Sequence, residues 1–146
     1  MARLIADDTL AILTIAQEAL LEPYDGKLAV AEVIRNRMQQ KYMSDGTVEG
    51  TVLKPYQFSG WNQGDPVRIK AMRYDDSDPK IQECIRAWEE AKTGSQTVGA
   101  SVLYYNPDYR MPDGSLIKTP KWALPGYGKE VARAGSHVFF VESKEV

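Results

Sequence analysis

The sequence predicts a single, mainly helical α+β domain. At 146 residues the chain is long enough for one hydrophobic core and too short for two, so we expect residues 1–146 to form one domain. Helical apolar spacing or helix-capping residues mark three stretches before residue 95. One run rich in β-branched and aromatic residues near the end is typical of a strand.

The first predicted helix starts near Asp8 and is apolar on most of its sides. Asp8 or Thr9 offers an N-cap, and Pro23 is expected to end the helix. A helix that is apolar nearly all the way round is normally buried.

Glu18 lies in the last turns of this helix, where a charge is costly. Burial raises the pKa of a carboxyl group, and the negative end of the helix dipole acts in the same direction. Most helical glutamates point to water, but this one is a candidate general acid. Its polar neighbours along the helix are Thr14, Gln17 and Glu22.

A second helix is predicted from Lys27 to about Lys41. Val30, Ile34 and Met38 repeat at the spacing of one helical face, and turn residues 23–26 precede them. The connection is short, so the first two helices should pack as neighbours.

Residues 42–66 are interrupted by glycine, proline and other turn residues. Within them, residues 51–53 fit either a helical turn or a short strand. Aromatic and amide side chains then crowd into residues 56–62. A loop rich in flat, amphipathic side chains is often functional.

The clearest helix prediction covers residues 79–93. Asp78 is a plausible N-cap, Pro79 occupies the first helical position, and Gly94 follows the end.

The rest of the chain predicts extended and irregular structure. The apolar run 101–105 ends at Asn106-Pro107, and residues 107–128 form a long loop rich in proline and glycine. Loops of this length tend to bind ligands or act as lids. Residues 137–141 are predicted to be a strand.

Composition argues against several classes of function. The net charge is −2 without a basic stripe, which argues against nucleic-acid binding. No run reaches the roughly 18 apolar residues of a membrane span, and the first residues lack the apolar core of a secretory signal. With one cysteine and one histidine, we expect no metal site and no internal disulfide.

The functional groups that remain available for chemistry are carboxylates, together with aromatic and amide side chains. His137 is the only histidine, and the chain lacks both a nucleophile elbow and a phosphate-binding glycine loop. Glycan cleavage uses a carboxylic acid of raised pKa, while aromatic rings stack on sugars and amides bind their hydroxyl and acetamido groups. The residues therefore favour a glycan-cleaving enzyme.

Several motifs follow one another along the chain: Glu18-Ala19, Glu22-Pro23-Tyr24-Asp25-Gly26, Ala29 to Arg37, Lys54 to Ser59, Tyr104-Tyr105-Asn106-Pro107, Lys121-Trp122 and Gly135 to Phe140. In this order they resemble the cell wall hydrolase family of the spore-cortex lytic enzyme SleB, which implies a lysozyme-like fold. Any one motif is weak evidence, but together they span nearly the whole chain.

The resemblance implies a lysozyme-superfamily lytic transglycosylase or muramidase that acts on the MurNAc–GlcNAc β-1,4 bond of peptidoglycan. Glu18 stands where the family has its catalytic acid. Gln17 replaces the family's usual glycine, and Leu20-Leu21 replaces a frequent Arg-Gly pair. With Glu18 as the sole general acid and base, we expect a 1,6-anhydro product and no cofactor.

Other candidate residues surround this acid. Glu22 is either a second catalytic carboxylate or a structural residue that orients a loop or meets Arg37, and the structural role is favoured. Phe58 and Trp61 either line the groove or pack under the loop, and His137 is expected to be structural. The expected substrate-binding residues are Gln57, Phe58, Tyr104, Tyr105, Asn106, Glu22 and Trp122.

The expected partners are peptidoglycan glycan strands, without nucleic acid or membrane insertion, and the chain is expected to be a monomer. A phage endolysin released through a holin, or a virion-borne wall-degrading protein, would fit such a domain. The rival hypothesis is a non-catalytic glycan-binding or structural module with the same fold.

Overall fold

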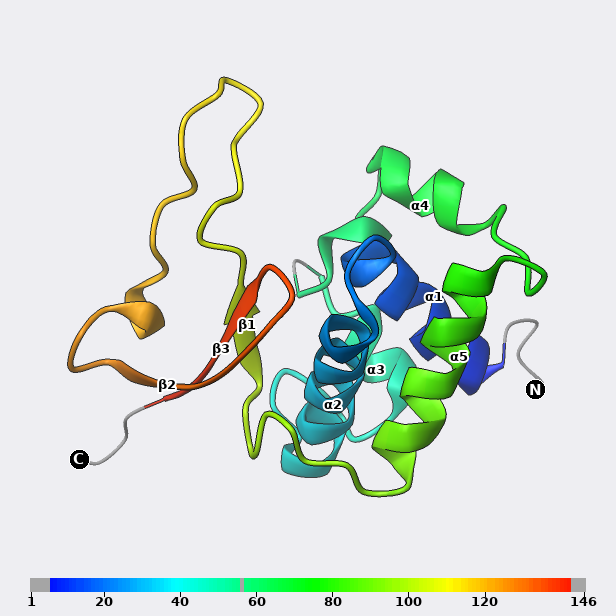
Figure 1. Cartoon of the computed structure of the whole chain (residues 1–146), viewed down its shortest axis with the longest axis horizontal. Coiled ribbons are helices and arrows are strands. Elements are labelled where there is room, and N and C mark those ends of the chain that lie inside the picture. The colour runs from blue at the N-terminus through cyan, green and yellow to red at the C-terminus, as the bar shows by residue number, and fades with distance from the viewer. Residues whose placement is uncertain (1–5, 56, 143–146) are drawn as a thin grey trace.

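A computed structural model describes residues 6–55 and 57–142, apart from the side chain of Ile69. Figure 1 shows a helical body, a small sheet beside it, and residues 106–127 projecting from the sheet as a long arm. This architecture confirms the predicted mainly helical α+β class. The elements are α1 (Asp7–Ala19), α2 (Tyr24–Gln40), α3 (Val48–Val52), a 3-10 turn (Ser59–Trp61), α4 (Pro66–Ala71), α5 (Pro79–Lys92), β1 (Leu103–Tyr105), a second 3-10 turn (Lys121–Ala123), β2 (Gly128–Ala134) and β3 (His137–Glu142).

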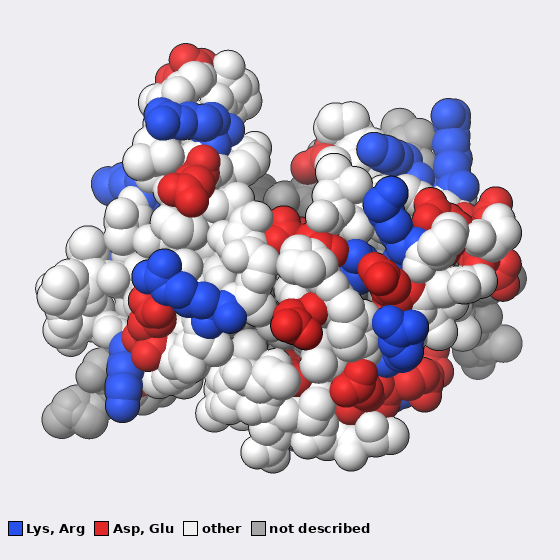
Figure 2. Space-filling model, viewed as in Figure 1, with Lys and Arg blue, Asp and Glu red and all other residues white. Residues whose placement is uncertain are grey.

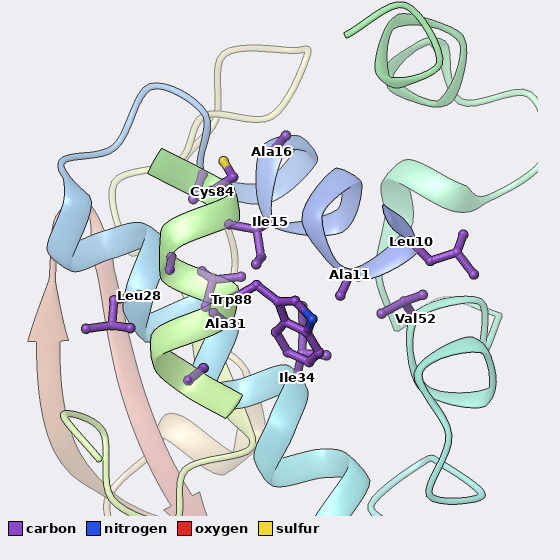
Figure 3. Packing of buried hydrophobic residues seen from close by; sticks show 14 of the residues in the cluster. Leu10, Ala11, Ile15, Ala16, Leu28, Ala31, Ile34, Val52, Cys84 and Trp88 are labelled. Carbon is purple, nitrogen blue, oxygen red and sulfur yellow. The ribbon is translucent and has the colours of Figure 1, made fainter. Parts of the chain in front are cut away.

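The main hydrophobic core lies between α1, α2, α3 and α5. Trp88 of α5 is 1% exposed and packs among the small and branched side chains of the other helices (Figure 3). Cys84, one turn earlier, is fully buried in the same core. Both residues are structural, as their spacing along α5 indicates.

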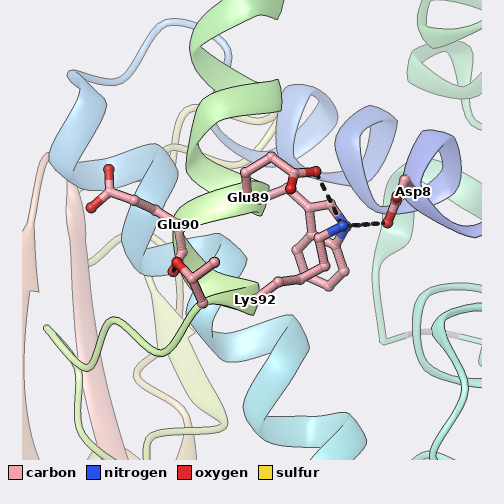
Figure 4. A network of polar contacts seen from close by, with 6 residues as sticks. Asp8, Glu89, Glu90 and Lys92 are labelled. Carbon is pink, nitrogen blue, oxygen red and sulfur yellow. Dashed lines mark hydrogen bonds and ion pairs between the residues drawn. The ribbon is translucent and has the colours of Figure 1, made fainter.

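The start of α1 is fastened to α5 by a polar contact at the edge of this core. Asp8 accepts hydrogen bonds from the Trp88 indole at 2.8 Å and from Lys92 at 3.0 Å, and Lys92 also pairs with Glu89 (Figure 4). These two donors lower the pKa of Asp8. Asp8 therefore joins two helices and is not the predicted N-cap, a position that Ala6 occupies.

The boundary between α1 and α2 differs from the prediction. α1 ends at Ala19, and Pro23 does not close it but serves as the N-cap of α2. The Gly26 and Lys27 amides both bond to the Pro23 carbonyl, so the predicted turn is the first turn of α2. Proline suits a helix start because it has no amide hydrogen to leave unpaired.

Lys27 holds this connection onto α5. Its side chain is almost fully buried, and its ammonium donates to the Glu22 carbonyl at 2.6 Å and to the Glu83 carboxylate at 2.9 Å. Lys27 therefore joins the segment that follows α1 to α5.

The later elements test the remaining predictions. Thr51 and Val52 turn out to be helical, at the end of α3, with Leu53 as the C-cap, and α4 was not predicted. The α5 prediction is confirmed, with the Asp78 side chain accepting from the Lys80 amide at 2.8 Å. Residues 137–141 form most of β3 as predicted, whereas β2, an edge strand with few β-forming side chains, was missed.

The three antiparallel strands lie in the order β1-β3-β2, and their side chains alternate between two faces. Tyr104 is opposite Phe139, on the face that packs with Ala29 and Val33 of α2. Tyr105 belongs to the cluster on the other face. The sheet therefore directs Tyr104 toward the helical body.

Most polar residues of α2 are buried, although the polar side of an amphipathic helix normally faces water. Glu32 is 0% exposed and accepts hydrogen bonds from the hydroxyls of Ser95 and Thr97 and from the Val98 amide, at 2.7 to 3.0 Å. The carboxylate thereby organises the chain that leaves α5.

The next turn of α2 continues this attachment. The Asn36 amide donates to the carbonyls of Gly99 and Ser101 at 2.9 Å, and Arg37 donates to the Val102 carbonyl at 2.9 Å. Arg35 donates to the Ala91 carbonyl at 2.8 Å. Together these side chains hold residues 95–102 along α2 and deliver the chain to β1.

We expect Glu32→Ala to lower the free energy of unfolding by about 2 kcal/mol or more, because it removes the acceptor of the buried Val98 amide and of the hydroxyls of Ser95 and Thr97. Glu32→Gln keeps one acceptor and should lose less. Gln39→Ala, on the exposed end of the same helix, should change stability by only about 0.5 kcal/mol. Urea unfolding measures all three, and equal stability of Glu32→Ala and Gln39→Ala would contradict this role.

Candidate active site

Glu18 is the next-to-last residue of α1 and the centre of the candidate site. The Tyr104 hydroxyl donates a hydrogen bond of 2.5 Å to its carboxylate, from a residue 86 positions away in the sequence. Burial is the main cause that raises the pKa of Glu18 above 4.5, with a contribution from the charge of Asp65. The Tyr104 hydrogen bond and the charge of Arg37 act in the opposite direction.

Tyr104 is held by aromatic contacts on the sheet. Its ring stacks on Phe139 at 5.4 Å, and the His137 ring meets it edge-on at 4.9 Å. Burial, together with the nearby Glu18, raises the pKa of the tyrosine well above 10. The hydroxyl therefore remains a hydrogen-bond donor to Glu18 at any pH at which the protein would work.

Arg37 places a buried positive charge behind the site. Its guanidinium lies 4.9 Å from the Phe58 ring centre and donates to the Gln57 side chain at 3.2 Å. Burial lowers the pKa of Arg37, while Tyr104 and Glu18 support its charged form. This cation favours the carboxylate form of Glu18, the form produced when Glu18 donates its proton.

Glu22 orients a loop, one of the roles predicted for it. Its carboxylate accepts from the Ser136 amide at 2.6 Å and from the Ser136 hydroxyl at 3.0 Å. The neighbouring Gly135 has a positive φ of 56°, and a Cβ there would lie 2.2 Å from the Glu22 oxygen. Glu22 thus fixes the β2–β3 turn against the end of α1 and does not meet Arg37.

His137 follows that turn and faces Tyr104. Burial lowers its pKa, and the charge of Glu22 opposes this only in part. Its Nδ1 atom is buried without a hydrogen-bond partner among the described residues. A neutral ring packed on Tyr104 agrees with the structural role expected from the sequence.

The structure brings only some of the predicted binding residues to Glu18. Tyr104 contacts it directly, and Gln57 reaches the site through Arg37. Phe58 is 1% exposed, so it packs under the loop as in the second of the predicted alternatives and cannot stack on a sugar. The indole of Trp61 donates to Thr14 at 2.8 Å, which fastens the same loop to α1.

Tyr105, Trp122 and Asn106 lie elsewhere. Tyr105 and Trp122 meet edge-on at 5.6 Å on the sheet face opposite Tyr104. The Asn106 side chain accepts from the Asp108 amide at 2.9 Å, where the arm begins. Contact of these three with substrate stays a prediction.

Asp65 is a functional candidate that the sequence did not single out, since it was one of several loop acids that could reach Glu18 only by folding back. Its side chain caps α4 by accepting from the Val67 amide at 2.9 Å, and its charge acts on Glu18. Asp65-Pro66 carries the same N-cap and proline signal as Asp78-Pro79, so α4 could have been recognised.

A pocket of about 280 Å³ opens beside Glu18, between the end of α1 and α4. Figure 2 shows the surface hollowed between the arm and the α4 side of the molecule, with acidic side chains at the base of the hollow. The pocket is lined by Gln17, Glu18, Ala19, Leu20, Leu21, Glu22, Val67, Lys70 and Tyr74.

In the part of the chain that the structure describes, no three His, Cys, Asp or Glu side chains are grouped so that they could hold a metal ion. None of its helices has the length and apolar character needed to cross a bilayer.

The fold matches two solved catalytic domains of SleB proteins. The catalytic domain of the Bacillus cereus SleB protein superposes with a TM-score of 0.68 at 24% identity, over 95% of this chain and 94% of that one. The catalytic domain of the germination-specific lytic transglycosylase SleB from Bacillus anthracis gives 0.64 at 23%, over 95% and 98%.

The sequence comparisons identify the family. The model of the Cell Wall Hydrolase family matches residues 21–140, and the chain belongs to this family. Spore cortex-lytic enzymes of Oceanobacillus iheyensis and Halalkalibacterium halodurans are 29% and 30% identical over 122 residues, which is 84% of this chain. The chain spans 37% and 31% of the length of these two relatives. The family match begins after Glu18, so the role of Glu18 rests on the geometry above.

The raised pKa of Glu18 predicts how Glu18→Gln changes stability. Between pH 4.5 and the raised pKa, the folded protein holds a proton that the unfolded chain releases, so stability falls as pH rises through this window. Glutamine removes this penalty. Glu18→Gln should therefore melt higher than wild type at neutral pH, by about 4 °C per kcal/mol at this chain length, and show no such gain below the window.

Glu83→Gln is a matched control of opposite sign. Lys27 lowers the pKa of Glu83, so this variant should melt lower than wild type at neutral pH. Thermal melts at several pH values measure both. A Glu18→Gln variant less stable than wild type at neutral pH would contradict the burial of the carboxylate.

Proposed function

We propose that this chain is a peptidoglycan lytic transglycosylase that cleaves the MurNAc–GlcNAc β-1,4 bond, with Glu18 as general acid and base. The observation that carries the proposal is the part-buried Glu18 carboxyl beside an open pocket, with its pKa raised above 4.5. A carboxylic acid of raised pKa keeps its proton to a higher pH and can protonate a glycosidic oxygen. Membership of the cell wall hydrolase family supports peptidoglycan as the substrate.

In the first step, protonated Glu18 gives its proton to the glycosidic oxygen as the bond to the MurNAc C1 breaks. The new Glu18 carboxylate accepts the Tyr104 hydrogen bond at 2.5 Å and lies in the field of Arg37. Both interactions are stronger with the ionised form, so they stabilise the state that follows proton transfer.

In the second step, the Glu18 carboxylate takes the proton of the MurNAc 6-hydroxyl as that oxygen attacks C1. The ring closes to a 1,6-anhydro sugar, and Glu18 returns to its protonated form. The attacking hydroxyl belongs to the bound substrate and is already in place, so no second base is needed to recruit water.

Glu18→Gln should reduce lysis of purified peptidoglycan by roughly 10²–10⁴-fold, because glutamine keeps the shape and has no transferable proton. Glu130→Gln, an exposed change on β2, is the matched control and should keep full activity. Turbidity of a wall suspension measures the rate, and circular dichroism confirms folding. Activity above about a tenth of wild type would remove Glu18 from this role.

A muramidase is the second candidate function, because Asp65 lies close enough to Glu18 for its charge to raise the pKa of Glu18. A hydrolase needs a second carboxylate at about 5–5.5 Å for retention or about 6.5–9.5 Å for inversion of configuration. From the sequence, Glu22 was the acid considered for this role. Its two oxygens, however, accept hydrogen bonds from the amide and the hydroxyl of Ser136. Asp65 is therefore the better candidate for a second carboxylate.

Product analysis and Asp65→Asn separate the two candidates. A transglycosylase releases anhydro-MurNAc ends that are one water molecule lighter than reducing ends, and Asp65→Asn should leave its rate within about threefold. A hydrolase releases reducing MurNAc ends and should lose about 10²-fold or more in Asp65→Asn. Glu22→Gln can still bond Ser136 through its amide and should keep most activity under either mechanism.

We further propose a phage-type setting, as expected from the sequence: lysis of a bacterial host from within, or action from the virion. Expression in a suitable host with and without a holin tests the first form. Lysis that depends on the holin supports it, whereas lysis without one contradicts it.

A further inference from the structure

Gln17, immediately before Glu18, has a buried side-chain amide with unused hydrogen-bonding capacity. Neither its Nε2 nor its Oε1 atom has a partner among the described residues. A buried amide normally satisfies both groups, and leaving them unpaired lowers stability. The mechanism above does not use this residue, so the amide needs a separate explanation.

The surroundings keep the Gln17 amide next to the pocket. A Cβ at Gly60 would lie 2.5 Å from Gln17 Oε1, so the side chain rests directly on the glycine backbone. The neighbouring Trp61 is tied to Thr14 of the same helix, which fixes this surface. The amide makes no hydrogen bond in this position. Turning toward the pocket therefore breaks no existing hydrogen bond.

The pocket lined by Gln17 and Glu18 is mixed in character. Leu20, Leu21 and Val67 provide apolar walls, and Tyr74 adds an aromatic ring. Lys70 of α4 is its positive residue, and this exposed side chain forms no ion pair with any described residue. An occupant of this pocket would meet apolar surface, one free amide, the Lys70 cation on the α4 side, and the carboxyl groups of Glu18 and Glu22 on the α1 side.

We propose that this pocket is the subsite for a peptide-bearing N-acetyl sugar of the substrate, next to the bond that Glu18 cleaves. The Gln17 amide reads the acetamido group, because an amide can both donate to and accept from another amide. Lys70 binds a carboxylate of the attached peptide. This inference rests on the proposed function and adds to it the two residues that select the substrate.

Because the Gln17 amide is buried without partners, a role in substrate binding can be distinguished experimentally from a role in stability. Gln17→Met keeps the length of the side chain and removes the unpaired polar atoms, so it should leave the melting temperature unchanged or higher. A residue kept only for stability would not respond in this way. Gln17→Met should nevertheless lower kcat/KM on intact peptidoglycan by roughly 5- to 30-fold, the equivalent of one or two lost hydrogen bonds.

Binding to defined fragments shows which group Gln17 reads. In the Glu18→Gln background, which prevents turnover, calorimetry compares an N-acetylated muramyl fragment with its de-N-acetylated counterpart. Gln17→Met should weaken binding of the first by roughly 5- to 30-fold and leave the second unchanged. Equal effects on both fragments, or no effect on either, overturn the assignment of Gln17.

Lys70 is tested by the presence of the peptide. Lys70→Gln should raise KM on peptide-bearing glycan by about 5-fold or more and have no effect on glycan stripped of peptides by an amidase. Lys80→Gln, an exposed lysine on α5, is the matched control and should behave as wild type on both. An equal loss on both glycans, or no loss on peptide-bearing glycan, overturns the assignment of Lys70.

The wild-type protein separates this inference from the proposed function. If it cleaves peptidoglycan but Gln17→Met and Lys70→Gln do not show the expected losses, the subsite alone is wrong. If it cleaves no peptidoglycan at all, both the function and the subsite are overturned.

Discussion

The attachment of residues 95–102 to the polar side of α2 is the constraint on which the site depends. The side chains of Glu32 and Asn36 bond mainly to backbone groups and hydroxyls of this segment, and Arg37 continues the series to the Val102 carbonyl. Tyr104 follows two residues later. The position of its hydroxyl against Glu18 is thus set by hydrogen bonds made at the far side of α2.

This attachment buries polar side chains that would normally remain in water. Each has its hydrogen bonds satisfied, because a buried carboxylate or guanidinium without partners would cost several kcal/mol. The favourable contacts also have directional geometry, which an apolar interface between α2 and an irregular segment would lack. A segment without regular structure is in this way held firmly enough to start a strand at a defined place.

The site itself works against stability. Glu18 is part-buried with one hydrogen-bond donor, Tyr104, and desolvation disfavours its ionised form. Gln17 adds an amide with no partner among the described residues. Such local costs are typical of functional sites, where the arrangement that chemistry requires differs from the most stable one. The core around Trp88 and the hydrogen bonds between α2 and residues 95–102 stabilise the fold and offset these local costs.

Local signals in the sequence predicted the elements that they specify directly. Asp78, Pro79 and Gly94 define the ends of α5 because capping is a short-range interaction. The buried polar face of α2 could not be predicted in the same way, since Asn36 bonds to carbonyls more than 60 residues away. Its residues have the composition of a solvated face, and only the folded chain shows what covers them.

Glu18 was predictable from its apolar surroundings and from the resemblance, whereas its partners were not. The three acids near the pocket, Glu18, Glu22 and Asp65, are distinguished by their surroundings in the fold. Glu22 has both oxygens bonded to Ser136, so it is the poorest proton donor or acceptor of the three. Asp65 uses one oxygen to cap α4. Glu18 has a raised pKa and access to the pocket, which are the two properties that proton transfer to a glycosidic oxygen requires.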